Sequence, residues 1–108
     1  VGCIMFSKLK DEVYNKIEWL TVDQNNLYIH RLAVDPINQK KGFARSMMNF
    51  AEDQAAKMNC VSVRLDTFSK NPRNSKFYKS RDYVQLGDVY FLKQSEFPFH
   101  CFEKIIKY

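Results

Sequence analysis

The stretch that decides the fold is Gln39-Lys40-Lys41-Gly42-Phe43-Ala44. It follows a strand-like segment that ends at Asp35-Pro36, and it precedes a long helix-like segment. A basic, glycine-containing loop in this position suits an anion, because the free amides of the first helical turn and the helix dipole both favour negative charge. Gly42 and the small Ala44 allow a phosphate to approach the backbone closely. We therefore interpret the loop as a phosphate-binding site.

The composition is that of a folded protein. The chain has 108 residues, of which 45% are hydrophobic and 15% aromatic, so we expect one globular domain over residues 1–108 rather than a disordered segment. No apolar run has the length of a membrane span and no signal-peptide pattern is present, so we expect no membrane partner. The net charge of +5 suits a polyanionic ligand but decides little alone.

The three cysteines, Cys3, Cys60 and Cys101, are far apart and lack the spacing of a metal site or a redox motif. We expect buried thiols in a reducing cytoplasm, and no metal. The chain also begins with an apolar run at Val1 and without an initiator methionine. Because domain termini are usually polar, we expect that upstream residues precede this run.

Periodicity and turn residues predict an alternation of strands and helices, hence an α/β or α+β fold. Residues 2–8 and 13–20 are predicted to form a hairpin. Asn71-Pro72 predicts a helix start, with an N-cap residue followed by proline at the first helical position. Further strands are predicted at residues 27–34, 61–67, 83–86, 89–93 and 99–107, and helices at 43–58 and 71–81.

Two blocks of this pattern resemble the acyl-CoA-binding core of the GNAT acyltransferases. The first is Leu32-Ala33-Val34-Asp35-Pro36 followed by Gln39-x-x-Gly42-x-Ala44, which is similar to the family fingerprint Gln/Arg-x-x-Gly-x-Gly/Ala. The second, Asn71-Pro72-Arg73-Asn74-Ser75-Lys76-Phe77-Tyr78 with Tyr83 five residues on, resembles the family's Asn-x-x-Ala-x-x-Leu-Tyr-x-x-x-Gly-Phe helix. Phe102-Glu103-Lys104 also resembles a common family ending.

The sequence departs from the family in three respects. Asn74 stands in place of alanine, and Asp82 in place of a glycine that would adopt a left-handed conformation. The strand and helices that precede the hairpin in the family are not in this sequence. The resemblance therefore implies a mixed, mostly antiparallel sheet with a splayed central strand pair and flanking helices, lacking its first strand and helices.

The resemblance implies a role for each matching residue. Coenzyme A would bind through its pyrophosphate to the loop amides and through its pantetheine arm to the main chain of the preceding strand. Tyr78 would protonate the thiolate that leaves coenzyme A. The residues assigned to the coenzyme are Leu32, Ala33, Val34, Gln39, Lys40, Lys41, Gly42, Phe43, Ala44, Arg45 and Asn71.

The general base is less defined by the resemblance. His30 has a suitable pKa class and would lie on the same strand face as Tyr28 and Leu32 by simple alternation. A water chain or Glu18 are alternatives, and a structural role for His30 stays open. His100 and Cys101 look like packing residues, so we favour direct transfer over an acyl-cysteine intermediate.

The expected function is transfer of an acetyl group from acetyl-CoA to a primary amine, on a small molecule or a peptide. The alternative is a non-catalytic module that binds acyl-CoA. Nucleic-acid binding ranks last, because the aromatic residues fall at strand-core positions rather than among exposed basic ones. A homodimer is plausible if missing upstream elements leave an edge or an apolar face to cover.

Overall fold

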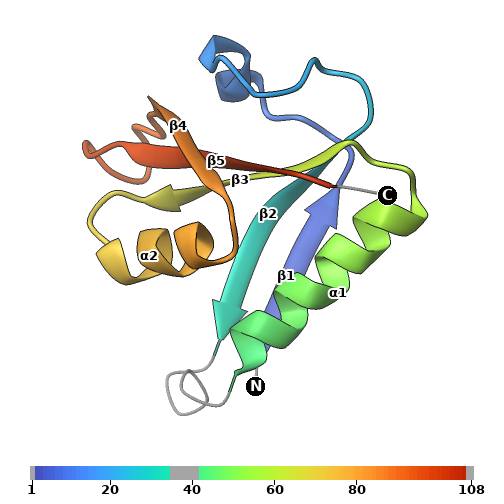
Figure 1. The fold of residues 1–108 in the computed structure, drawn as a ribbon. Helices are drawn as coiled ribbons and strands as arrows, with labels where there is room; N and C mark the ends of the chain where they lie inside the picture. The colour runs from blue at the N-terminus through green and yellow to red at the C-terminus, as the bar shows by residue number, and fades with distance from the viewer. Residues whose placement is uncertain (1, 35–41, 107–108) are drawn as a thin grey trace.

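The computed structural model of the chain describes residues 2–34 and 42–106. Within these residues, two α-helices, a 3-10 helix and five strands follow one another (Figure 1). They are β1 (Gly2–Ser7), η1 (Glu12–Lys16), β2 (Asn26–Val34), α1 (Phe43–Lys57), β3 (Ser62–Phe68), α2 (Pro72–Ser80), β4 (Val84–Val89) and β5 (Phe99–Ile105).

The five strands form one sheet in the order β1-β2-β3-β5-β4. The pairs β1–β2, β3–β5 and β4–β5 are antiparallel, and β2–β3 is parallel. The sheet is therefore mixed and mostly antiparallel, as the sequence predicts.

The central pair is splayed. β2 and β3 are in register only at Asn26↔Ser62, Leu27↔Val63 and Tyr28↔Arg64. Beyond this point β2 stays paired with β1 and β3 with β5, so the two strands diverge (Figure 1). The predicted splay is confirmed, and it divides the sheet into two halves that meet at one end.

A bulge in β2 lies next to this divergence. Phe6 is opposite Ile29 and Met5 is opposite Arg31, so His30 is an extra residue in the β1–β2 ladder. Tyr28 consequently lies on one face of the sheet, whereas Leu32 packs with Ile29 on the other. The prediction that Tyr28 and Leu32 share a face is wrong, because the bulge interrupts the alternation.

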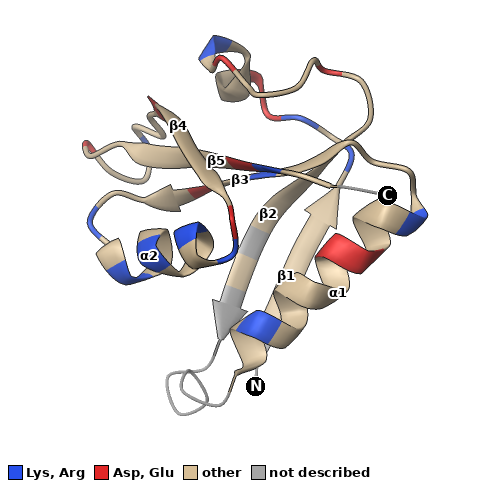
Figure 2. Ribbon diagram, in the orientation of Figure 1, with Lys and Arg blue, Asp and Glu red and all other residues tan. Residues whose placement is uncertain are grey.

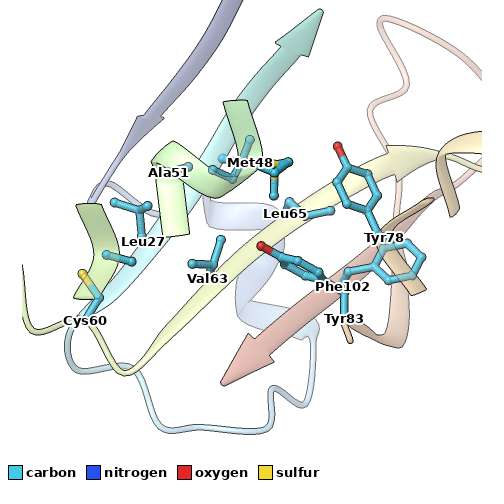
Figure 3. Close-up of a cluster of buried hydrophobic side chains, with 11 residues drawn as sticks. Leu27, Met48, Ala51, Cys60, Val63, Leu65, Tyr78, Tyr83 and Phe102 are labelled. Carbon is cyan, nitrogen blue, oxygen red and sulfur yellow. The ribbon is translucent and has the colours of Figure 1, made fainter. Parts of the chain in front are cut away.

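Both α-helices cover one face of the sheet. α1 buries Met48, Ala51 and Ala55, which recur at three- and four-residue steps and form its apolar stripe. They pack against alternate residues of the strands and against α2, in what we call the first cluster (Figure 3). Its buried members are Leu27, Ile29, Met48, Ala51, Ala55, Cys60, Val63, Leu65, Tyr78, Tyr83 and Phe102.

The opposite face is covered by η1 and the segment around it. Tyr14 and Ile17, three residues apart, are buried there with Tyr28, Val89 and Cys101, which we call the second cluster. The predicted strand 13–20, and with it the hairpin, is wrong: Asp11 caps a 3-10 helix instead, accepting a hydrogen bond from Val13 N at 3.2 Å. The apolar residues of segment 13–20 are spaced to pack on the sheet rather than to extend it. β1 therefore pairs with β2.

Smaller differences concern the end of the chain and the cysteines. One strand, β4 (Val84–Val89), stands in place of the two predicted over 83–86 and 89–93, with a register shift between Gln85 and Asp88. The predicted strand over 90–93 is therefore wrong. The last strand ends at Ile105 within the described residues. Cys60 and Cys101 are buried as predicted, whereas Cys3 is exposed because it lies on edge strand β1.

A buried ion pair stands where β2 and β3 are last in register. Arg64 and Glu103 are both 0% exposed, with 3.0 Å between Arg64 Nε and Glu103 Oε2. The Arg64 guanidinium also donates to Tyr28 Oη at 2.9 Å, Asp23 Oδ1 at 2.6 Å and the Thr21 carbonyl at 2.7 Å. These bonds tie the closed end of the divergence to the segment before β2.

Replacing Glu103 with glutamine should lower the free energy of unfolding by about 3 kcal/mol, because the buried Arg64 charge loses its fully buried partner and keeps only the half-exposed carboxylate of Asp23. Urea denaturation measures this loss. Lys10→Ala is the control: Lys10 pairs with the half-exposed Asp23, and its removal should cost less than about 1 kcal/mol. Equal effects of the two substitutions would contradict the assignment of Arg64–Glu103 as the critical pair.

Candidate active site

The start of α1 has the geometry of an anion site. Gly42 is the N-cap residue with φ of 78°, a left-handed conformation that favours glycine. The first turn contains no acidic residue, and Arg45 is exposed beside it (Figure 2). The amides of Phe43, Ala44 and Arg45, at the N-terminus of α1, are therefore part of an electropositive surface. Gln39, Lys40 and Lys41 lie outside the described residues.

The carboxyl end of β2 leads into this helix start (Figure 1). Leu32, Ala33 and Val34 pair with Ile4, Cys3 and Gly2 of β1. On their other side no strand is in register with them among the described residues, because β3 pairs with β2 only as far as Tyr28. Main-chain groups of this part of β2 are thus open to a ligand, as the assignment to a pantetheine arm requires.

Tyr78 stands on the helical face of the sheet. Asn71 begins α2 by accepting a hydrogen bond from Asn74 N at 3.3 Å, and Pro72 occupies its first turn. One face of α2 then places the Tyr78 ring 5.7 Å from Tyr83 and 5.9 Å from Phe102. Asp82 ends this segment with φ of 71°, so it adopts the left-handed conformation in which the family has glycine.

The Tyr78 hydroxyl is free to act on a ligand. The side chain is 4% exposed, and Figure 3 shows its hydroxyl directed away from Tyr83 and Phe102. It has no hydrogen-bond partner among the described residues, and it is not among their enclosed polar atoms, so it reaches solvent. Burial, followed by the nearby charge of Asp66, raises the pKa of Tyr78 to about 12. The hydroxyl is therefore a proton donor at neutral pH.

Asp66 and His30 lie on the face of the sheet opposite to Tyr78, near enough for the charge of His30 to affect the pKa of Asp66. His30 is exposed on β2 with its Nε2 2.7 Å from Ser7 Oγ. Asp66, on β3, lies two residues beyond the last paired residue, and its Oδ2 accepts a hydrogen bond from the Tyr14 hydroxyl. Burial raises the pKa of Asp66, while the hydrogen bond from Tyr14 and the charge of His30 act in the opposite direction.

The second oxygen of Asp66 is open. Asp66 Oδ1 forms no hydrogen bond within residues 2–34 and 42–106. The one side-chain polar atom in these residues that is both buried and without a partner is Ser75 Oγ. Asp66 Oδ1 is therefore not fully buried and reaches solvent. The arrangement thus offers a proton donor on the helical face and a carboxylate on the other, at the same opening of the sheet.

Comparison with known proteins identifies the family. The sequence model described as "Acetyltransferase (GNAT) family" matches residues 1–83. The chain belongs to the GNAT acetyltransferase family. A comparison with curated protein sequences gave no match.

Solved structures share the fold of this GNAT chain. Ard1 from Thermoplasma volcanium superposes with a TM-score of 0.80 and 22% identity, over 100% of this chain and 64% of that one. The NatC complex bound to Gag peptide and CoA gives 0.75 and 19%, over 98% and 61% of the two chains. An acetyltransferase from Bacillus cereus gives 0.63 and 28%, over 75% and 56%. The GNAT chain therefore spans less than two thirds of each of these proteins.

The structure of the GNAT chain places the predicted residues that it describes on three elements. Leu32 to Val34 end β2, Gly42 to Arg45 begin α1, Tyr78 lies on α2, and His30 lies on β2. Asn71 is exposed and serves as a helix cap. Glu18 is exposed and forms no hydrogen bond or ion pair within the described part of the chain. The sequence analysis assigned no role to Asp66 or Tyr14, since the polar alternation of residues 62–66 is equally typical of a solvated strand face.

Residues 2–34 and 42–106 contain no group of three His, Cys, Asp or Glu side chains able to hold a metal ion. Neither α1 nor α2 has the length and apolar character needed to cross a membrane.

Replacing Gly42 with alanine should lower the free energy of unfolding by about 1 to 2 kcal/mol, because a Cβ disfavours the left-handed conformation. The cost is conformational, since an added Cβ would meet nothing within 4 Å. Gly42→Asn should cost less, because asparagine tolerates this conformation. Thermal or urea unfolding of the two variants checks the order, and equal losses would contradict a backbone origin.

Proposed function

We propose that this chain binds acetyl-CoA and transfers the acetyl group to a primary amine by direct attack on the thioester. The observation that carries the proposal is the divergence of β2 and β3. The N-terminus of α1 and Tyr78 lie on one face of the sheet at this divergence, and Asp66 lies on the other face. Family membership supports acetyl transfer as the reaction class.

The residues fit the coenzyme. The amides of Gly42 to Arg45 and the exposed Arg45 charge would hold the pyrophosphate, and the open edge of β2 would hold the pantetheine arm. Leu32, Ala33 and Val34 would then direct the thioester into the opening. An amide of the same strand would stabilise the oxyanion of the tetrahedral intermediate.

Each proton in the reaction then has a carrier. The amine nitrogen bonds to the thioester carbon and passes a proton to Asp66 Oδ1. The carbon–sulfur bond breaks, and the Tyr78 hydroxyl donates its proton to the leaving thiolate. Solvent returns a proton to Tyr78 and takes one from Asp66. We assign the base to Asp66 because one of its oxygens is held in place and burial raises its pKa, whereas His30 is exposed.

The position of Asp66 indicates the face of the sheet from which the amine acceptor would enter. Asp66 and His30 lie on the face covered by η1, away from both helices, so donor and acceptor approach from opposite faces. One structural neighbour is the NatC complex bound to a peptide, which makes a peptide amine a suitable first probe. Small polyamines and lysine derivatives complete a panel.

Isothermal calorimetry with acetyl-CoA, followed by a CoA-release assay with this panel, tests the proposal. We expect saturable binding and amine-dependent release of CoA. Binding without turnover with any amine would favour a non-catalytic acyl-CoA-binding module. Failure of the folded chain to bind acetyl-CoA would overturn both functions.

Tyr78→Phe should lower kcat by at least about tenfold, because the thiolate loses its proton donor, while the acetyl-CoA affinity stays within about twofold. Since the pKa of Tyr78 is about 12, its titration should produce no basic limb in the pH–rate profile below about pH 11. Unchanged turnover in this variant would remove Tyr78 from the mechanism.

Asp66→Asn should lower kcat/KM by about 100-fold or more, with acetyl-CoA affinity retained, because the acceptor amine loses its base. The wild-type rate should fall at low pH as Asp66 becomes protonated. His30→Gln is the matched comparison, since it alters the residue that faces Asp66 across the opening. A greater loss with His30→Gln than with Asp66→Asn would assign the base to His30 instead.

A further inference from the structure

The 3-10 helix η1 is capped at its start and packs against the sheet at its end. At its start, Asp11 caps it through Val13 N. At its end, Ile17 packs against Gly87 of β4, where an added Cβ would lie 2.9 Å from Ile17 Cδ1. Gly87 lies within the register shift of β4, so the edge strand is shaped to admit Ile17.

Tyr14 occupies the middle of η1 and is held on all sides. It is 4% exposed, with its ring 5.2 Å from Trp19 and 5.8 Å from Tyr28. Trp19 Nε1 donates to the Tyr14 carbonyl at 3.0 Å. From this buried position the Tyr14 hydroxyl donates to Asp66 Oδ2.

We infer that η1 positions the Asp66 carboxylate in the opening of the sheet, with Tyr14 as the positioning residue. The Tyr14 hydroxyl holds one carboxylate oxygen, so the other is turned toward solvent in the opening. This inference rests on the proposed function only for its catalytic meaning. The hydrogen bond and its effect on the charge of Asp66 stand independently of any reaction.

A hydrogen bond donated to a carboxylate stabilises its charged form. Burial raises the pKa of Tyr14, so its hydroxyl stays protonated and remains a donor. Tyr14 thus keeps a half-buried carboxylate ionised, which a base must be before it can accept a proton.

Other charged and titratable groups also face Asp66. Asp11, next to η1, raises the pKa of Asp66 by repulsion, and His30 of β2 lowers it. Tyr78 of α2 and Cys101 of β5 are near enough for the Asp66 charge to raise their own pKa values. Tyr14 is the neighbour that donates a hydrogen bond to the carboxylate within the described part of the chain.

The test is a pH titration of the Asp66 carboxyl carbon by ¹³C NMR, on residues 1–108 of wild-type and variant sequence. Tyr14→Phe should move the titration midpoint to higher pH, because the carboxylate loses its donor while the ring stays in place. Tyr28→Phe is the matched control. It removes another buried hydroxyl from the same cluster, but one that accepts from Arg64, so the midpoint should not move.

A second variant tests the opposite sign and guards against misfolding of the first. Asp11→Asn keeps a capping side chain and removes a negative charge near Asp66, so the midpoint should move to lower pH. An unchanged Asp66 midpoint in folded Tyr14→Phe overturns the inference. If that variant does not fold, an unchanged or raised midpoint in Asp11→Asn does so.

Kinetics separate this inference from the proposed function. In Tyr14→Phe the acid limb of kcat/KM should move to higher pH with the carboxyl midpoint, and acetyl-CoA affinity should be unchanged. If Asp66→Asn retains full activity, Asp66 is not the base and the proposed mechanism fails, whatever the NMR midpoint does. If Asp66→Asn is inactive and Tyr14→Phe keeps the wild-type pH profile and midpoint, only the positioning role fails.

Discussion

The fold depends on one buried ion pair, Arg64–Glu103, at the last residues where β2 and β3 are in register. Neither side chain is exposed, so both charges must be satisfied within the protein. Strands β3 and β5 supply the pair, and Tyr28, Thr21 and Asp23 complete its hydrogen bonds. The cost of burying these charges is offset only when the strands meet at this point. The same requirement therefore fixes where the divergence of the sheet begins.

Because the closed end is fixed, the two sides of the opening can differ in chemistry. The helical face has a helix N-terminus and the protonated Tyr78, and both suit the negative charge of a phosphate or a thiolate. The opposite face has Asp66, whose carboxylate suits an amine. A continuous sheet would keep these groups apart, since side chains on opposite faces are separated by the paired backbone. The divergence of β2 and β3 interrupts the paired backbone that would otherwise lie between them.

The sequence predicts the elements whose signals are local. The helix after Gly42, the helix capped by Asn71 and the strands over 27–34 and 61–67 follow from periodicity and capping, which neighbouring residues determine. The 3-10 helix does not, because Tyr14 and Ile17 are recognisable as buried only once the sheet and the register shift near Gly87 exist. No local sequence pattern indicates the bulge at His30 either, and the bulge changes which residues of β2 share a face of the sheet. Asp66 was missed because a polar residue at every second strand position looks the same on a solvated face as beside an opening.

These differences follow a physical division between the two halves of the site. The proposed coenzyme half consists of backbone amides and one glycine conformation, so a short fingerprint at fixed spacing is enough to specify it. The proposed acceptor half consists of side chains of β2, β3 and η1, which come from three separate segments of the chain. No local spacing relates Tyr14 to Asp66, because they are 52 positions apart along the chain. The sequence motif therefore predicts the acyl donor, whereas the proposed acceptor residues can be identified only from the folded structure, in which β2 and β3 diverge between Tyr78 and Asp66.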